Sequence, residues 1–126
     1  MSTPSLPPTV AAHLPTGLLI DGAWRAATGG GTFAVGDPGT GQVLFDVADA
    51  TAQDGLDALA AADAARPAWR AVAPRERGEL LRAVFETLIN RIDDFAALVT
   101  AEGGKPLAES RAEVVYAAEY VRWYSE

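Results

Sequence analysis

The residues whose spacing best suits chemistry are two carboxylates near the C-terminal end of the chain. Glu109 and Glu113 are four positions apart in a segment with a helical pattern, so they share one helix face, the minimum geometry for a general acid beside a general base. No cluster of substrate-binding aromatic residues accompanies them in the sequence, and Arg111 and Lys105 lie close by. The pattern therefore favours an ordinary charged surface over a catalytic pair.

Three other features suggest ligand chemistry, and each has a simpler interpretation. Lys105 stands in a Gly-Lys-Pro sequence, which is not a phosphate-binding loop because Pro106 lacks the hydroxyl that binds magnesium. The glycines at 29–31 neither follow a long parallel strand nor open a helix, so a connection between strands is favoured. His13 lies alone in a proline-rich segment, where an exposed, unpositioned imidazole is expected. The residues alone thus reveal no complete active site.

The composition excludes several classes of function. A net charge of −7, with ten scattered Lys and Arg residues among 126, disfavours nucleic acid as a partner. The absence of cysteine removes disulfides and thiolate nucleophiles, and a single histidine disfavours a metal site. The sequence contains neither a signal-peptide pattern nor an apolar run long enough to span a membrane. We therefore expect a soluble cytoplasmic protein without a membrane partner.

The N-terminal part of the chain predicts a tail followed by antiparallel strands. Residues 1–17 are rich in proline and show no periodicity, so a flexible or extended tail is expected. Residues 18–48 predict antiparallel β structure, with Asp21 and Gly22 as the turn of the first hairpin. The expected strands are 18–20, 23–25, 32–35 and 43–47.

Residues 49–126 predict about four helices. Thr51 and Asp54 have the spacing of a capping box that starts a helix reaching about residue 65, and Pro67 marks a boundary after it, where Trp69 is expected to be a packing anchor. Pro74 begins the segment with the strongest apolar periodicity, which extends to Ile92. A break is expected near residues 93–94, and helix then continues to about residue 102.

The last helix has a clear start and no recognisable end. Gly103 or Gly104 closes the preceding helix, and Pro106 suits the first turn of the next. After Tyr124 there are only two residues, with no glycine, asparagine or proline to end the helix. This pattern predicts that the chain is an incomplete piece, ending mid-helix, of a larger protein.

Five segments, in order, resemble the N-terminal part of the NAD(P)-dependent aldehyde dehydrogenase superfamily. The resemblance covers residues 18–126, with Asp37 at a turn position where the family usually has Asn and Gly103 where it usually has another residue. The segments are LLIDGAWRAA, DPGTGQVLFDVADAT, PAWR, PRER and AEGGKPLAE. Within the superfamily, LPTGLLIDGAWR, AEGGKPLAE and RWYSE look most like succinate-semialdehyde dehydrogenases.

The resemblance implies an α/β fold in which these strands and helices pack on the family's nucleotide-binding domain. It implies oxidation of a small aldehyde, succinic semialdehyde, by a complete protein that uses NAD or NADP and forms a homo-oligomer, a dimer or tetramer. The family's nucleophilic cysteine, base glutamate, oxyanion-hole asparagine and cofactor-binding residues belong to segments beyond Glu126. The chain alone is therefore expected to be inactive, to bind no cofactor, and to have the remainder of its own subunit as its partner.

The resemblance assigns one candidate site. Aligning residues 122–124 with the family's Arg-aromatic-aromatic sequence places Ala112 and Tyr116 on the helix face that borders the substrate entrance in relatives; a packing role is the simpler interpretation of Tyr116. Two other functions stay open. The chain is alternatively a short, non-catalytic helical interaction module derived from the family, or an independent enzyme that uses Glu109 and Glu113.

Overall fold

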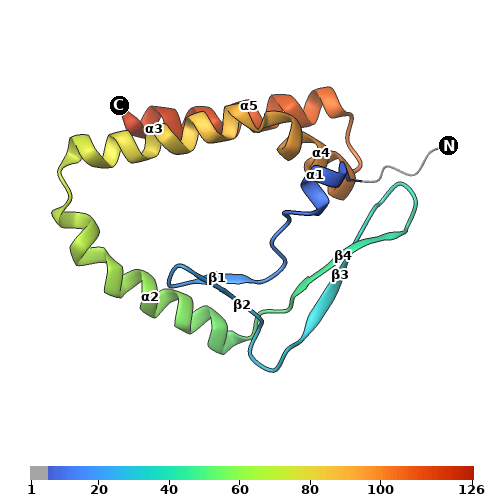
Figure 1. The fold of residues 1–126 in the computed structure, drawn as a ribbon, viewed down its shortest axis with the longest axis horizontal. Helices are drawn as coiled ribbons and strands as arrows, with labels where there is room; N and C mark the ends of the chain where they lie inside the picture. The colour runs from blue at the N-terminus through green and yellow to red at the C-terminus, as the bar shows by residue number, and fades with distance from the viewer. Residues whose placement is uncertain (1–5) are drawn as a thin grey trace.

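The structure, a computed structural model, describes residues 6–126 and is an open assembly of helices and two β-hairpins (Figure 1). The described part confirms the α/β class, with antiparallel strands first and helices after them. The elements are α1 (Pro8–Ala11), β1 (Leu18–Ile20), β2 (Ala23–Arg25), β3 (Thr32–Gly36), β4 (Val43–Ala48), α2 (Ala52–Ala71), α3 (Pro74–Asn90), α4 (Ile92–Gly103) and α5 (Leu107–Ser125).

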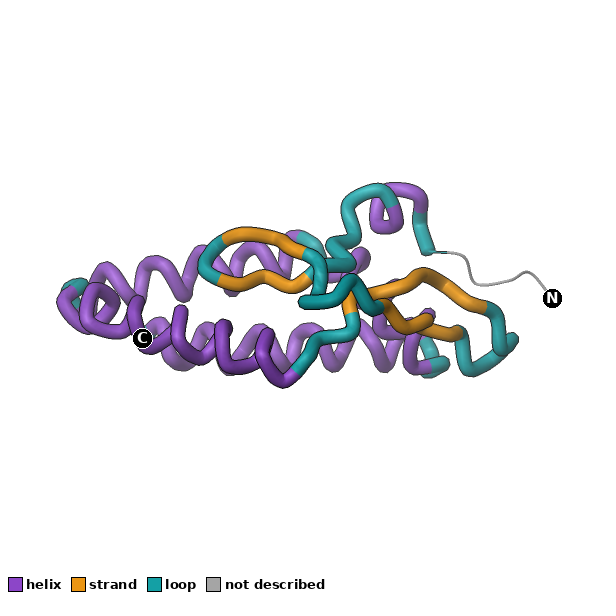
Figure 2. The backbone as a smooth tube through the Cα atoms, turned by 90° about the horizontal axis from the view of Figure 1, so that it is seen from below, coloured by secondary structure: helices purple, strands orange, loops and turns teal. Residues whose placement is uncertain are grey.

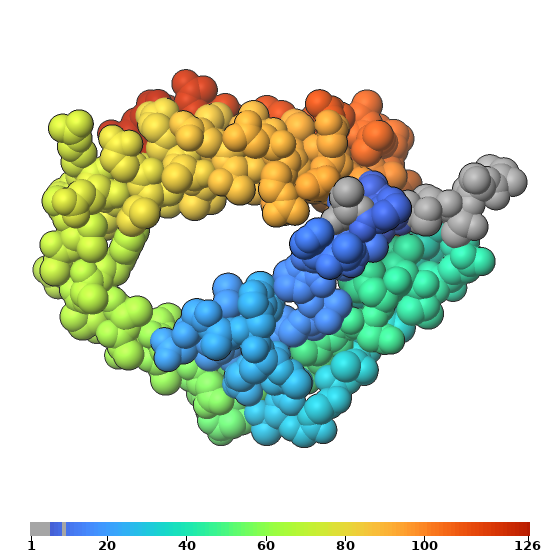
Figure 3. Space-filling model, viewed as in Figure 1, coloured from blue at the N-terminus to red at the C-terminus, as the bar shows by residue number. Residues whose placement is uncertain are grey.

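The elements form a ring rather than a filled globule. Helices α3 and α5 pack side by side along one edge, α4 packs against α5, and α2 closes the far end and contacts β1. The space-filling view shows an opening through the centre of the molecule (Figure 3). The small buried core lies mainly between α4 and α5, and much apolar surface elsewhere is therefore exposed.

The strands form two separate antiparallel pairs, seen as two distinct orange loops in Figure 2. In the first pair Leu18 faces Arg25, and the turn uses positive φ angles of 52° at Asp21 and 73° at Gly22, as hairpins with two-residue loops require. In the second pair Thr32 faces Ala48, with an irregularity at the Val35/Gly36 step. The predicted hairpins are thus confirmed, although they do not join into one sheet.

Helix α2 begins as predicted and ends later than predicted. Thr51 and Asp54 form the complete capping box. The boundary expected at Pro67 is wrong, because the helix continues through it to Ala71. A proline leaves the carbonyl four residues earlier without its helical bond. Here that residue is Asp63, which is exposed, so water can satisfy the carbonyl.

The junctions of the last three helices differ slightly from expectation. The break falls at Arg91 (φ −111°), two residues before the expected position, so Asp93 and Asp94 lie in the first turn of α4 instead. Gly104 closes α4 in the left-handed conformation with φ 70°, as predicted. Pro106 lies just before α5 as its cap rather than inside its first turn.

The N-terminal segment contains structure that the sequence did not predict. A single helical turn runs from Pro8 to Ala11, and Val10 within it is buried. The Thr16 carbonyl accepts a hydrogen bond of 2.8 Å from the Ala48 amide, which ties the segment to β4. The part of the predicted tail at residues 1–5 lies outside the described residues.

Candidate functional site

Helix α5 carries the candidate residues, and its buried stripe determines where they face. Ser110, Val114 and Ala118 are buried at four-residue spacing. The Ser110 hydroxyl forms a 2.8 Å hydrogen bond with the Thr100 hydroxyl of α4, which fixes the rotation of α5. Ala112 and Tyr116 consequently lie on the exposed side of the helix.

Tyr116 is paired with a second tyrosine one helical turn later. The hydroxyl oxygens of Tyr116 and Tyr120 are 2.8 Å apart in a hydrogen bond, and their rings meet edge to face with centroids separated by 5.2 Å. This hydrogen bond, aided by desolvation, raises the pKa of Tyr120 above its ordinary value. Because 66% of Tyr116 is exposed, it is not a core packing residue in this chain.

The tyrosine pair belongs to a larger aromatic surface, which we call the aromatic face of α5. Its aromatic members are at least half exposed, and together with Glu119 they line an open depression of about 330 Å³. The members are Tyr116, Tyr120, Trp123 and Tyr124. Sequence reasoning singled out only Tyr116, although the three- and four-residue spacing of the aromatic residues already placed all of them on neighbouring helical positions.

The charged residues at the start of α5 form ion pairs. The Lys105 ammonium lies 2.5 Å from a carboxylate oxygen of Glu113, and Arg111 pairs with Asp93 of α4. Glu113 therefore faces a cation rather than acting with Glu109 as an isolated carboxylate pair. This arrangement fits the charged-surface interpretation.

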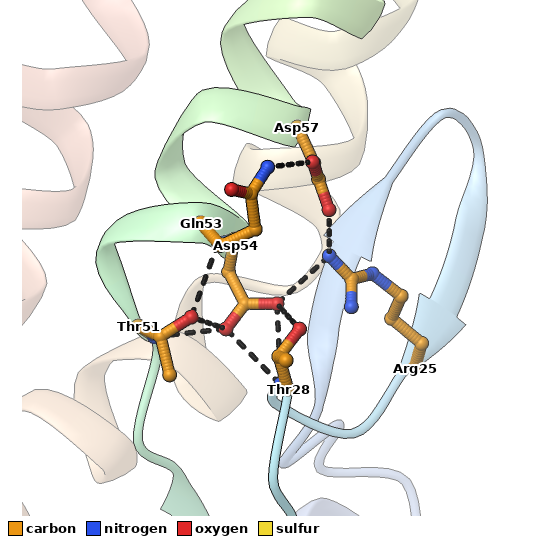
Figure 4. Close-up of polar contacts among 6 residues, drawn as sticks. All are labelled: Arg25, Thr28, Thr51, Gln53, Asp54 and Asp57. Atoms are coloured by element: carbon orange, nitrogen blue, oxygen red, sulfur yellow. Dashed lines mark hydrogen bonds and ion pairs between the residues drawn. The ribbon is translucent and has the colours of Figure 1, made fainter.

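A second polar cluster, which sequence reasoning found only in part, surrounds Asp54 (Figure 4). This carboxylate is 1% exposed and accepts hydrogen bonds from the Thr51 amide (2.8 Å), the Thr51 hydroxyl (2.8 Å) and the Thr28 hydroxyl (2.8 Å). It also pairs at 2.8 Å with Arg25, whose guanidinium reaches Asp57 at 3.1 Å as well.

The cluster is structural rather than catalytic. The Thr51 amide, with further donors from Thr28 and the Thr51 hydroxyl, holds the pKa of Asp54 far below its ordinary value despite burial. Asp54 therefore stays charged and fully bonded, and cannot accept a proton near neutral pH. Its function is to fasten the first hairpin and the 26–31 connection to the start of α2.

Comparison with known proteins places this arrangement in a family. The model of the aldehyde dehydrogenase family matches residues 24–126, which include most of β2, all of β3 and β4, and the four long helices. The chain belongs to the aldehyde dehydrogenase family. The predicted resemblance is thus confirmed.

Relatives of this aldehyde dehydrogenase chain include two semialdehyde dehydrogenases. It is 44% identical over 107 residues to glutarate-semialdehyde dehydrogenase of Pseudomonas aeruginosa, covering 85% of this chain and 22% of that protein. It is 51% identical over 84 residues to succinate-semialdehyde dehydrogenase of Paenarthrobacter nicotinovorans, covering 67% and 19%. The chain thus spans about a fifth of the length of these relatives.

A solved structure agrees with the sequence relatives. The succinate-semialdehyde dehydrogenase of Burkholderia pseudomallei superposes with a TM-score of 0.88 at 38% identity, covering 96% of this chain and 24% of that one. A similar arrangement of hairpins and helices therefore occurs within a longer dehydrogenase chain.

The glycine-rich turn at residues 29–31 lacks the form of a dinucleotide-binding loop. Gly29 and Gly30 have φ of 88° and 73°, but they form a turn closed by the Gly30 amide and the Ala27 carbonyl, and they lead into a strand instead of a helix N-terminus. Residues 6–126 also contain no group of three or more side chains placed to hold a metal ion. Among the same residues no helix has the length and apolarity to cross a membrane.

Proposed function

We propose that this chain is the N-terminal part of an NAD(P)-dependent aldehyde dehydrogenase that oxidises succinic semialdehyde to succinate when complete. The observation that carries the proposal is the 51% identity to a succinate-semialdehyde dehydrogenase together with coverage of only 19% of that relative. The chain contributes the strands and helices of the N-terminal part. The catalytic and cofactor-binding groups come from the rest of the protein.

On this proposal the chain alone is inactive and binds neither NAD nor NADP. The family's reaction needs a cysteine thiolate, and the sequence has no cysteine. No described glycine-rich turn opens a helix where a pyrophosphate would bind. Its partners are then the remainder of its own subunit, other subunits of a homo-oligomer, and a small aldehyde in the cytoplasm.

Ala112 and Tyr116 are proposed to border the substrate entrance of the complete enzyme. Both lie on the exposed side of α5, so they are available to line a passage formed with another segment. The apolar Ala112 and the hydroxyl of Tyr116 would then contact the aldehyde as it enters. The proposal also includes the division of the chain after residue 17, where the tail ends, and after residue 48, where the strands give way to the helical segment.

The experiment is to read the gene beyond the codon for Glu126 and to assay both forms of the protein. We expect an open frame that supplies a cysteine and a glutamate in family context, and a complete protein that oxidises succinic semialdehyde with NAD⁺ or NADP⁺. The purified 126-residue chain should match a heat-killed control. Activity of the short chain would contradict the proposal, and a stop codon directly after Glu126 would favour the interaction module instead.

Glutaric semialdehyde is the second candidate substrate. The 44% identity over 107 residues to glutarate-semialdehyde dehydrogenase supports it specifically. The two substrates differ by one methylene between the aldehyde and the carboxylate. The ratio of kcat/KM for the two aldehydes in the complete protein decides between them.

A further inference from the structure

The tyrosine pair of α5 leaves one hydroxyl proton unused. Two hydroxyl groups carry two protons, and the single hydrogen bond of 2.8 Å between Tyr116 and Tyr120 uses one of them. Among the described residues neither hydroxyl has a second hydrogen-bond partner. The tyrosine that accepts this bond therefore keeps an O–H group that can donate to a ligand.

This donor is accessible, protonated and strengthened by its neighbour. Tyr116 is 66% exposed and Tyr120 54%, and both line the open depression of the aromatic face of α5. The bond with Tyr116 raises the pKa of Tyr120, so the Tyr120 hydroxyl keeps its proton at neutral pH. A hydroxyl that already accepts a hydrogen bond is polarised and donates more strongly. The tyrosine pair is thus a better donor than a single tyrosine.

The acidic residue that lines the depression does not carry an uncompensated charge. This residue is Glu119, and Nη1 of Arg122 lies 3.4 Å from its carboxylate. The other lining side chains, Trp123 and Tyr124, are neutral at pH 7. An anion that approaches the tyrosine pair therefore meets an aromatic surface and an ion pair rather than a lone negative charge.

The proposed substrates carry the chemical group that such a donor recognises. Succinic and glutaric semialdehyde each have an aldehyde at one end and a carboxylate at the other. Because the aldehyde is the end that reacts, it must go inward, and the carboxylate follows it on the side of the entrance. A hydrogen bond from a hydroxyl to a charged carboxylate is shorter and stronger than one between two neutral groups.

We propose that the hydroxyl pair of Tyr116 and Tyr120 binds the carboxylate of the semialdehyde and selects charged over uncharged aldehydes in the complete enzyme. The inference rests on the proposed function, including the substrate entrance beside α5, and adds Tyr120 as a specificity-determining residue. One hydroxyl donates to the carboxylate while it accepts the hydrogen bond of the other. Each tyrosine is needed, because the second hydroxyl orients and polarises the first.

The test compares succinic semialdehyde with butanal, which has a methyl group in place of the carboxylate. Tyr120→Phe is made in a chimera in which this chain replaces the matching segment of the Burkholderia pseudomallei enzyme. The KM for succinic semialdehyde should rise about tenfold, a difference of about 1.4 kcal/mol, while kcat and the KM for butanal stay unchanged. Tyr124→Phe is the matched control, since this tyrosine lies on the same face outside the pair, and it should change neither KM.

The two hydroxyls should act as a unit. Tyr116→Phe should raise the same KM, and the double variant should be little worse than the more affected single variant, because residues in one hydrogen-bond network are not additive. Both side chains are more than half exposed, so the Tm of each variant should match that of the parent chimera. Equal changes of KM for the two aldehydes, or no change after Tyr120→Phe, would overturn the inference.

The complete protein separates this inference from the proposed function. A complete protein that oxidises butanal with a higher kcat/KM than either semialdehyde would remove the proposed function and, with it, the carboxylate as the selected group. A complete protein that prefers the semialdehydes, and whose preference Tyr120→Phe leaves unchanged, would overturn the inference alone. We expect a preference for the semialdehydes that Tyr120→Phe reduces about tenfold.

Discussion

Gly104 lies directly against Pro38, so that the end of α4 touches the loop between β3 and β4. A Cβ placed on Gly104 would lie 3.0 Å from Cγ of Pro38. The loop is held for this contact by Asp37, which is 3% exposed and accepts hydrogen bonds of 2.8 Å from the Gly39 amide and the Thr40 hydroxyl. Asp37 thus makes the side-chain turn bonds that Asn and Asp both form at such positions. Glycine therefore suits position 104 for two reasons: its backbone adopts the left-handed conformation, and it has no side chain to collide with Pro38.

Gly104→Ala should destabilise the chain. The φ of 70° disfavours any residue with a Cβ by about 1–2 kcal/mol, and the new methyl would press on Pro38. The combined loss should lower the Tm measured by circular dichroism. The control is Gly104→Ala in a Pro38→Ala background, which removes the crowding but keeps the strained φ. Identical losses in both backgrounds would show that the contact with Pro38 contributes nothing.

At Gly78, α3 lies close to the backbone at the end of α5. A Cβ there would lie 2.6 Å from the Ser125 carbonyl oxygen, so Gly78→Ala should force the helices apart and cost about 1–3 kcal/mol. Gly55→Ala is the matched control, since that position in α2 has no neighbouring atom within 4 Å. It should instead stabilise by about 0.5–1 kcal/mol through helix propensity. Denaturant melts that show stabilisation by both substitutions would contradict the contact between Gly78 and Ser125.

Features that depend on neighbouring residues could be predicted from the sequence, whereas contacts between distant segments could not. The turn at Asp21 and Gly22 and the capping box at Thr51 depend on neighbours within a few residues, and both are confirmed. The bonds from Thr28 and Arg25 to Asp54 join residues that are 26 or more positions apart in the sequence, and no periodic pattern in the sequence predicts them. Secondary structure was therefore more predictable than the contacts between elements.

Two further assignments, at Pro67 and Trp69, also depended on the surroundings of α2. Pro67 is a strong helix breaker in general, but the exposed surroundings of α2 let the helix continue past it. Trp69 was expected to be a packing anchor, yet it is 47% exposed in this chain. Burial predicted from residue type alone therefore fails at this position.

Acid should weaken the attachment of the first hairpin to α2. The pKa of Asp54 is depressed in the folded chain, so its contribution to stability is complete above the unfolded value of about 4. That contribution is lost progressively as the pH falls below this value toward the folded pKa, where the carboxylate takes up a proton. Asp54→Asn should lower the Tm at neutral pH and flatten its decline in acid.

Asp63→Asn is the matched control for this prediction. Asp63 forms an exposed pair with Arg66, in which both side chains are more than 60% accessible. Such pairs contribute little, so the Tm profile of this variant should follow that of the unmodified chain. Thermal melts between neutral pH and the onset of acid unfolding provide the comparison. Parallel profiles for Asp54→Asn and the unmodified chain would refute the role of the carboxylate.

The hydrogen bond between Tyr116 and Tyr120 should be visible in a titration. Tyr116→Phe removes the partner hydroxyl that raises the pKa of Tyr120, so that pKa should fall toward its ordinary value near 10. The chain has three tyrosines, so Tyr124→Phe leaves only the pair to form phenolate. Phenolate absorbance against pH then reports the shift. An unchanged titration of Tyr120 after Tyr116→Phe would mean that the hydroxyls do not interact in solution.

The proposed substrate entrance makes a kinetic prediction for a chimera in which this chain replaces the matching segment of the Burkholderia pseudomallei succinate-semialdehyde dehydrogenase. Ala112→Leu adds bulk on the exposed side of α5 and, if the passage lies there, should lower kcat/KM for succinic semialdehyde by about tenfold or more. Ala117→Leu, at another exposed alanine of the same helix, should have little effect. Because narrowing an entrance hinders binding rather than chemistry, the loss should appear mainly as a raised KM. Equal kinetics for Ala112→Leu and Ala117→Leu would place the substrate path elsewhere.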